Sequence, residues 1–253
     1  MENFIIAPDV LLLLFLVALV AGFIDTLAGG GGLIVLPALI LAGLPPLQAL
    51  ATNKLQGSTG TFTATVMMLR HRRVRWADVK PPMLTAFIGA ASGSLVLLFI
   101  DPGFLSFVIP LVLIVIGIYF LFAGKLLETA THARVSAPLY RNAIVPAIGC
   151  YDGMFGPGTG SFFALSGVAW RGLPLLDATA MAKTLNFATN LASLLVFLIA
   201  GQIVWAVGLV MMAGQAAGAW LGSHMLFRIN PQYLRIAIVL VCMAMLMRYF
   251  LTS

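Results

Sequence analysis

Four ionisable residues stand within or beside long apolar stretches, where a charge is costly. Lys54 and Lys183 lie a few residues into hydrophobic segments, and Asp25 and Asp152 each precede a glycine cluster. A lysine in the hydrocarbon core of a membrane is unfavourable unless it is paired or hydrated, so we expect both lysines to be functional. Snorkelling of the ammonium group to the membrane surface is the alternative. We expect each aspartate to pair with a lysine, to orient unwound backbone, or to carry a coupled proton.

Two glycine clusters follow these aspartates, Gly29 to Gly32 and Gly156 to Gly160. Glycines let successive backbone N–H groups point into one concavity, and the helix expected after each cluster adds its positive N-terminal end. Such an end can hold an anion without a charged side chain. Close packing of helices is the simpler alternative. No Gly-Lys-Ser/Thr sequence follows either cluster, so nucleotide binding is not indicated.

Polar residues behind each lysine recur at helical spacing, with Ser58 after Lys54, and Asn186 and Asn190 after Lys183. These stripes predict a wet cavity, although interhelical hydrogen bonds could also account for them. The predicted substrate-binding residues are Gly29, Gly30, Gly31, Gly32, Asn53, Lys54, Ser58, Gly156, Gly158, Thr159, Gly160, Ser161, Lys183, Asn186 and Asn190.

The elements that position these residues are membrane helices. The chain is 61% hydrophobic and 9% charged, where an ordinary soluble domain has about 25% charged residues. The 253 residues leave no room for a separate soluble domain beside roughly eight spans of about 20 residues. The basic residues fall largely between apolar segments, which indicates cytoplasmic loops of an inner-membrane protein and not nucleic-acid binding.

The chain contains an internal duplication. With a shift of 129 positions, Gly43-Leu44-Pro45 matches Gly172-Leu173-Pro174, and Lys54 matches Lys183. With a shift of 127, Gly22-x-x-Asp25 matches Gly149-x-x-Asp152. We therefore predict a first transmembrane repeat at 1–127, a basic cytoplasmic connector at 128–141 and a second repeat at 142–253.

Each repeat is predicted to begin with two short apolar stretches around its glycine cluster, at 10–23 and 33–44 and at 143–149 and 161–170. A broken helix or a re-entrant hairpin accounts for such stretches, which are too short to cross a bilayer. Three full-length helices follow, at about 47–69, 81–100 and 104–124 in the first repeat and at about 176–200, 204–227 and 232–251 in the second.

Loop charge favours one orientation of the repeats over the other. If each broken element returns to its own side, the repeats are inverted and nearly all the basic residues share one side, with Arg248 misplaced. If the element crosses once, the repeats are parallel, and Arg171 and Arg228 lie outside. The inverted arrangement fits slightly better and is common among carriers with a binding site between the repeats.

The motifs resemble those of the sulfite exporter TauE/SafE family, also called the toluene sulfonate uptake permeases. The resemblance rests on the run from Ala21 to Gly32, on Pro37, on Ala51-Thr52-Asn53-Lys54, and on the second-half run from Gly149 to Gly160 with Ala182-Lys183-Thr184. It covers essentially the whole chain. It implies secondary transport of sulfite, sulfoacetate, thiosulfate or sulfonates, without a cofactor. The asymmetry between Asn53-Lys54 and Ala182-Lys183 leaves open whether both halves contact the substrate equally.

The sequence thus predicts an all-α polytopic membrane protein with two homologous repeats, favoured as inverted, that carries small anions by alternating access. A passive anion channel is the alternative. No His-Glu-x-x-His, Gly-x-Ser-x-Gly or metal-spaced Cys/His set occurs, so we expect neither an enzyme nor a metal site. The expected partners are a small anion and the lipid bilayer, and the sequence leaves a homo-oligomer open.

Overall fold

The computed structural model describes residues 7–126, 132–225 and 231–252, and the secondary structure of these ranges is helical throughout. In chain order the elements are α1 (Pro8–Ala28), α2 (Gly32–Leu41), α3 (Pro46–Arg70), α4 (Trp76–Leu98), α5 (Pro102–Leu126), α6 (Ala137–Leu139), the π-helical turn η1 (Tyr140–Ile144), α7 (Val145–Met154), α8 (Thr159–Arg171), α9 (Leu175–Ile199), α10 (Trp205–Met225) and α11 (Pro231–Thr252).

The first glycine cluster separates α1 from α2. Gly29 ends α1 with a φ of 75°, and its N–H donates to the main-chain oxygen of Asp25. A glycine in this left-handed conformation is a common end of a helix. With 21 residues α1 reaches about 32 Å, so the prediction of a short stretch ending at residue 23 was wrong. The helix continues because no glycine or proline occurs between Phe23 and Ala28. With 10 residues, α2 is short, as predicted.

The second cluster separates α7 from α8. Gly156 and Gly158 have φ values of 93° and 79°, and α8 begins at the next residue, Thr159. The helix before this break is longer than predicted, since α6, η1 and α7 follow one another from Ala137 to Met154. The predicted connector at 128–141 is therefore helical from Ala137, while its residues 128–131 lie outside the described part of the chain.

The six predicted full-length helices are present within a few residues of their expected bounds, as α3, α4, α5, α9, α10 and α11. Five segments of the described chain are long and apolar enough to cross a membrane: Pro8–Ala28, Trp76–Leu98, Pro102–Tyr119, Leu175–Ile199 and Trp205–Met225. Large apolar side chains such as Phe99 and Ile199 are 89% exposed, as lipid contact requires. The chain is a multi-pass, all-helical membrane protein.

Glycines allow two close helix crossings. A Cβ atom added to Gly218 of α10 would lie 1.9 Å from the main-chain oxygen of Leu19 in α1. A Cβ atom added to Gly89 of α4 would lie 2.2 Å from the main-chain oxygen of Pro146 in α7. Gly89 matches Gly218 in the 129-residue register, and Pro146 matches Leu19 in the 127-residue register. The crossing of α1 with α10 thus has a counterpart in the crossing of α7 with α4.

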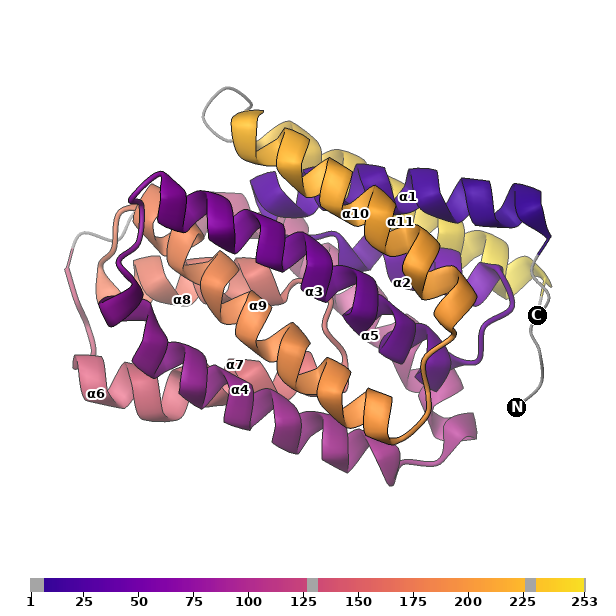
Figure 1. Ribbon diagram of the computed structural model, residues 1–253, viewed down its shortest axis with the longest axis horizontal. Coiled ribbons are helices and arrows are strands. Elements are labelled where there is room, and N and C mark those ends of the chain that lie inside the picture. Colours follow the sequence, from indigo (N-terminus) through magenta and orange to yellow (C-terminus); the bar gives the residue numbers. More distant parts are fainter. Residues whose placement is uncertain (1–6, 127–131, 226–230, 253) are drawn as a thin grey trace.

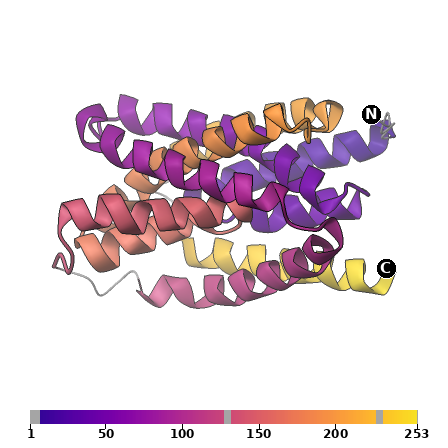
Figure 2. The same ribbon diagram turned by 90° about the horizontal axis from the view of Figure 1, so that it is seen from below.

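The helices run roughly along the long axis of the molecule, with α3 and α9 packed against each other (Figure 1). Figures 1 and 2 show that α1 begins and α11 ends at the same end of this axis, and that α6 begins at the opposite end. The loop between α3 and α4 and the loop between α8 and α9 lie at the same end as α6. Most polar residues of α3 and α9 are buried, so these two helices contribute much of the polar centre of the bundle.

Candidate functional site

The two glycine breaks meet at this polar centre. Ser161, in the first turn of α8, donates its hydroxyl to the main-chain oxygens of Ala28 (2.8 Å) and Gly29 (3.2 Å) at the end of α1. A Cβ atom added to Gly29 would lie only 2.9 Å from the Ser161 nitrogen. The breaks are therefore in direct contact, although they are far apart in the sequence.

Lys54 of α3 is bound to the end of α7. Its Nζ lies 2.8 Å from Oδ1 of Asp152 and also donates to the main-chain oxygen of that residue. Both side chains are almost completely buried, with 1% and 2% of their surface exposed. Thr159 donates its hydroxyl to the same Asp152 oxygen at 2.7 Å. The ammonium group thereby stabilises both a carboxylate and the negative end of a helix.

Lys183 of α9 makes the corresponding pair with the end of α1. Its Nζ lies 3.5 Å from Oδ2 of Asp25 and donates to the main-chain oxygen of Asp25. The other carboxylate oxygen, Oδ1, accepts the N–H of Gly31 at 3.1 Å. Each aspartate thus pairs with a lysine of the other half and also accepts a hydrogen bond from the residues of its own break, a backbone N–H at Asp25 and a threonine hydroxyl at Asp152.

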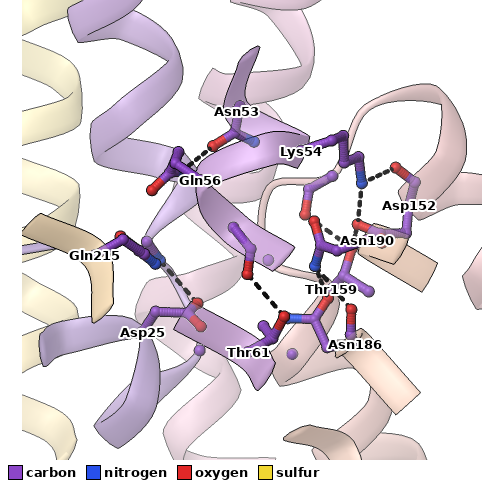
Figure 3. Close-up of a pocket in the computed structure, with 17 residues that line it drawn as sticks. Asp25, Asn53, Lys54, Gln56, Thr61, Asp152, Thr159, Asn186, Asn190 and Gln215 are labelled. Carbon is purple, nitrogen blue, oxygen red and sulfur yellow. Dashed lines mark hydrogen bonds and ion pairs between the residues drawn. The ribbon is translucent and has the colours of Figure 1, made fainter. Parts of the chain in front are cut away.

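A small cavity lies between the two breaks (Figure 3). Its free volume is about 30 Å³, which is room for about two water molecules. Its lining residues come from α1, α2, α3, α7, α8, α9, α10 and the two breaks, and most of them are buried. They are Asp25, Gly29, Gly31, Gly32, Asn53, Lys54, Gln56, Gly57, Thr61, Asp152, Gly156, Gly158, Thr159, Gly160, Asn186, Asn190 and Gln215.

Most of the predicted site residues line this cavity, and four do not: Gly30, Ser58, Ser161 and Lys183. The Ser58 hydroxyl donates to the main-chain oxygen of Lys54 within its own helix, so it is not directed at the cavity. Lys183 lies just behind the lining, where its Nζ would be 3.7 Å from a Cβ atom added to Gly160. Binding of a substrate by the lining residues stays a prediction.

Four lining residues were not among the predicted site residues: Gln56, Gly57, Thr61 and Gln215. Gln215 could have been found as an isolated amide in the apolar helix α10, since polar residues inside membrane segments are rare. The internal repeat gave no support for Gln215, because the matching residue in the first half is Ala86. In the same way, the counterpart of Gln56 is Leu185.

The two lysines do not give the site a net positive charge. Each ammonium group is offset by a carboxylate, so Lys54, Asp152, Lys183 and Asp25 together carry no net formal charge. The positive potential left at the cavity is that of the helix starts at Gly32 and Thr159. In the described ranges, no three His, Cys, Asp or Glu side chains gather as ligands for a metal ion.

Comparison with known proteins agrees with this architecture. The family model described as "Sulfite exporter TauE/SafE" matches residues 14–249. A Haemophilus influenzae protein named "Probable membrane transporter protein" is 43% identical over 95% of this chain and 94% of its own length. The Escherichia coli K12 "Probable membrane transporter protein YfcA" is 41% identical over 96% of this chain and 90% of its own length.

The Sinorhizobium "Probable membrane transporter protein ORF9" is also 41% identical, over 96% of this chain and 93% of its own length. No solved structure matches the chain. Three observations point to the same family. They are the motifs around both glycine breaks, the family match over nearly the whole length and the named relatives. The chain belongs to the sulfite exporter TauE/SafE family and is a membrane transporter of that family.

Proposed function

We propose that this transporter is a secondary carrier of small organosulfur anions or sulfur oxyanions, such as sulfite, sulfoacetate, thiosulfate or sulfonates. It moves them across the cytoplasmic membrane by alternating access. The description of its family supports a sulfur-containing anion. Its own site supports an anion of small size, because the cavity has room for about two water molecules.

One observation carries the proposal: two helix N-termini open onto one cavity inside a membrane protein. The backbone amides of Gly32 and Gly160 lie in the first turns of α2 and α8, where a helix provides no partner for its N–H groups. Both residues line the cavity. Helix starts of this kind bind oxyanions through N–H groups and the helix dipole. Asn186 and Asn190 add amide groups beside them.

The architecture supports an inverted pair of repeats, at 1–127 and 142–253, around this site. The reciprocal crossings of α1 with α10 and of α7 with α4 are what a two-fold relation between the halves produces. The helices α1 and α6 begin at opposite ends of the molecule (Figure 1). Arg72, Arg134 and Arg171 belong to segments at the α6 end, which we assign to the cytoplasm. Lys125 and Arg228 have side chains outside the described part of the chain.

The burial of the cavity favours a carrier over a passive channel. Lys54, Gln56 and Asp152 are 1–2% exposed, and Asn190 is 7% exposed. An open channel needs a wet path across the membrane, whereas a carrier passes through a state in which its site is closed to both sides. Rocking of one half against the other would open the cavity to each side in turn.

Purified protein in proteoliposomes tests the proposal with a panel of radiolabelled sulfur oxyanions and sulfonates. We expect saturable uptake of at least one small member of the panel and counterflow against unlabelled solute inside. Protein-free liposomes are the control. If uptake is linear in concentration and shows no counterflow, the protein is a channel. If no member of the panel enters, the proposed substrate class is wrong.

A further inference from the structure

The polar atoms of the cavity specify more than a negative charge. We propose that the carrier transports its solute as a monoprotonated monoanion, an oxyanion that keeps one O–H group, with hydrogensulfite as the simplest example. This inference rests on the proposed function and names the ionic form that the same site accepts. A proton would then cross the membrane on the solute itself, without a titrating side chain.

Three buried oxygen atoms at the cavity lack a hydrogen-bond partner. They are Oε1 of Gln56, Oε1 of Gln215 and Oδ2 of Asp152. All three residues line the cavity, and they are 2%, 3% and 1% exposed. A buried acceptor without a donor is unfavourable, so whatever fills the cavity is favoured if it donates hydrogen bonds.

The neighbouring contacts fix which atoms remain available. The Nε2 of Gln56 donates to Oδ1 of Asn53 at 2.7 Å, which leaves its Oε1 as the free atom. Oδ1 of Asp152 already accepts from both Lys54 and Thr159, which leaves Oδ2. In Figure 3, Gln56 and Gln215 lie on one side of the cavity and the Lys54–Asp152 pair lies on the other. A fully deprotonated sulfonate has only acceptors and can satisfy none of these oxygens.

The charges around the cavity also favour a monoanion. The groups that face the cavity or lie just behind it are Lys54, Asp152, Asp25 and Lys183, and their formal charges cancel. A dianion would find no full positive charge to offset it, and the penalty for removing an ion from water rises steeply with its charge. The starts of α2 and α8 each provide about half a positive charge. The negative ends of α1 and α7 are bound by the two ammonium groups, so the helix starts are the positive groups left for one negative charge.

The size of the cavity limits the solute as well. The free volume of about 30 Å³ suits a small inorganic oxyanion and excludes an aromatic sulfonate from this state of the protein. Monovalent charge, an O–H group and small size together point to hydrogensulfite in its O–H form. Its oxygens would accept from the first-turn amides of α2 and α8, and its hydroxyl would donate to a glutamine oxygen.

Initial uptake rates in proteoliposomes, measured across a series of pH values, test this. At a fixed total concentration, sulfite uptake should follow the fraction present as hydrogensulfite, and it should fall as the pH rises through the second ionisation of the acid. Methanesulfonate is a monoanion of similar size without an O–H group. We expect it to be transported at least about tenfold less well, the effect of one lost hydrogen bond. A dye inside the vesicles should report acidification during uptake.

Methanesulfonate also provides the internal control, because its own charge is constant across this range. If methanesulfonate transport changes with pH, the change comes from protonation of Asp25, Asp152, Lys54 or Lys183 and not from protonation of the solute. The variants Gln56→Met and Gln215→Met each remove one free oxygen while keeping a similar volume. The variant that removes the oxygen that accepts the solute hydroxyl should narrow the ratio of hydrogensulfite uptake to methanesulfonate uptake about tenfold. Gln202→Met, in the loop before α10, is the matched control and should leave the ratio unchanged.

The outcomes separate the two proposals. If wild-type protein moves methanesulfonate as well as hydrogensulfite, or if uptake follows the dianion, the inference is wrong and the sulfur-anion carrier stands. If both glutamine variants keep the wild-type ratio, the oxygens bind only water and the inference is again wrong. If no sulfur oxyanion enters at any pH, the proposed function and the inference fail together.

Discussion

The Lys54–Asp152 pair and the Lys183–Asp25 pair occupy equivalent positions in the two halves but differ in their surroundings. The Nζ of Lys54 lies 2.8 Å from its carboxylate and lines the cavity, whereas the Nζ of Lys183 lies 3.5 Å from its carboxylate and stays behind the lining. Asp152 accepts a threonine hydroxyl, while Asp25 accepts a backbone N–H. The halves therefore keep the same ion pair for different uses.

The cavity walls show the same separation. The first half contributes Asn53 and Gln56, and their counterparts in the second half are Ala182 and Leu185. The second half contributes Gln215, and its counterpart is Ala86. The glycine crossings, by contrast, are alike in both halves. We infer that the duplicated scaffold is shared, because backbone contact tolerates no side chain, while the polar lining is free to become asymmetric.

The largest expected effect comes from leaving one lysine unpaired. Asp152→Asn leaves the buried ammonium of Lys54 without its carboxylate, and it should destabilise the protein by about 3–5 kcal/mol. Asp25→Asn should destabilise it less, because the Asp25 side chain is 16% exposed, against 2% for Asp152. Thermal unfolding in detergent measures both, with the exposed Asp177→Asn as the control. Equal losses for Asp152→Asn and Asp25→Asn would remove the distinction between the pairs.

Double variants that neutralise both members of a lysine–aspartate pair leave no unpaired charge, so they test the effect of the pair on transport apart from its effect on stability. The double variant Lys54→Met, Asp152→Asn removes charged groups from the cavity lining and should reduce anion uptake by about 10- to 100-fold. Lys183→Met, Asp25→Asn should reduce it less, because Lys183 does not line the cavity. Uptake is normalised to the monodisperse protein recovered by size-exclusion chromatography. A larger transport defect in the second variant would mean that the wrong lysine has been assigned to the cavity.

The two glycine crossings, unlike the two ion pairs, should respond equally to substitution. Gly218→Ala and Gly89→Ala each place a methyl group against backbone, 1.9 Å and 2.2 Å from a main-chain oxygen. Each should destabilise the protein by about 1–3 kcal/mol, measured as a lower unfolding temperature. Gly117→Ala is the control, since its new methyl group meets only the flexible tip of Met243 at 3.1 Å. A loss in only one of the two crossings would contradict the shared scaffold.

The smallest expected effect concerns Thr159, whose counterpart is Gly32. Thr159→Val removes the hydroxyl that Asp152 accepts at 2.7 Å and should weaken stability by about 1 kcal/mol. Thr179→Val is the matched control, because that exposed hydroxyl donates only to its own helix at Leu175. A shift of the unfolding temperature beyond that of the control is the readout. An identical shift in both would show that Thr159 does not support the Lys54–Asp152 pair.

Much of the architecture could be predicted from local sequence. Long apolar runs identified the six full-length helices within a few residues, because a helix that crosses lipid must keep its backbone bonded and its surface apolar. The start of each half was less accurate. The apolar run ends at residue 24, but the helix continues through Asp25 to Ala28 and ends only where Gly29 takes a positive φ. A charged residue such as Asp25 ends an apolar run in the sequence, but the helix continues past it.

The site was predictable only in part, for a related reason. Lysines and aspartates in apolar segments are conspicuous in any sequence. The internal repeat showed that each of them has a matching residue of the same type in the other half. Gln56 and Gln215 did not stand out, because their counterparts are apolar and their inclusion depends on how α3 and α10 are rotated toward the cavity. Rotation about a helix axis is set by packing against neighbours, and a single sequence does not report those neighbours.

The sequence by itself determined that the chain lies in a membrane and that glycine clusters interrupt its helices at two places, and its internal matches predict a duplication. These follow from composition and local backbone preference. Only the tertiary structure decided that Lys54 pairs with Asp152 and Lys183 with Asp25, across 98 and 158 residues of chain. Such pairing depends on which helix ends meet in the folded bundle. Once they meet, each buried ammonium group binds a carboxylate and a helix end, and the cavity is left without net formal charge.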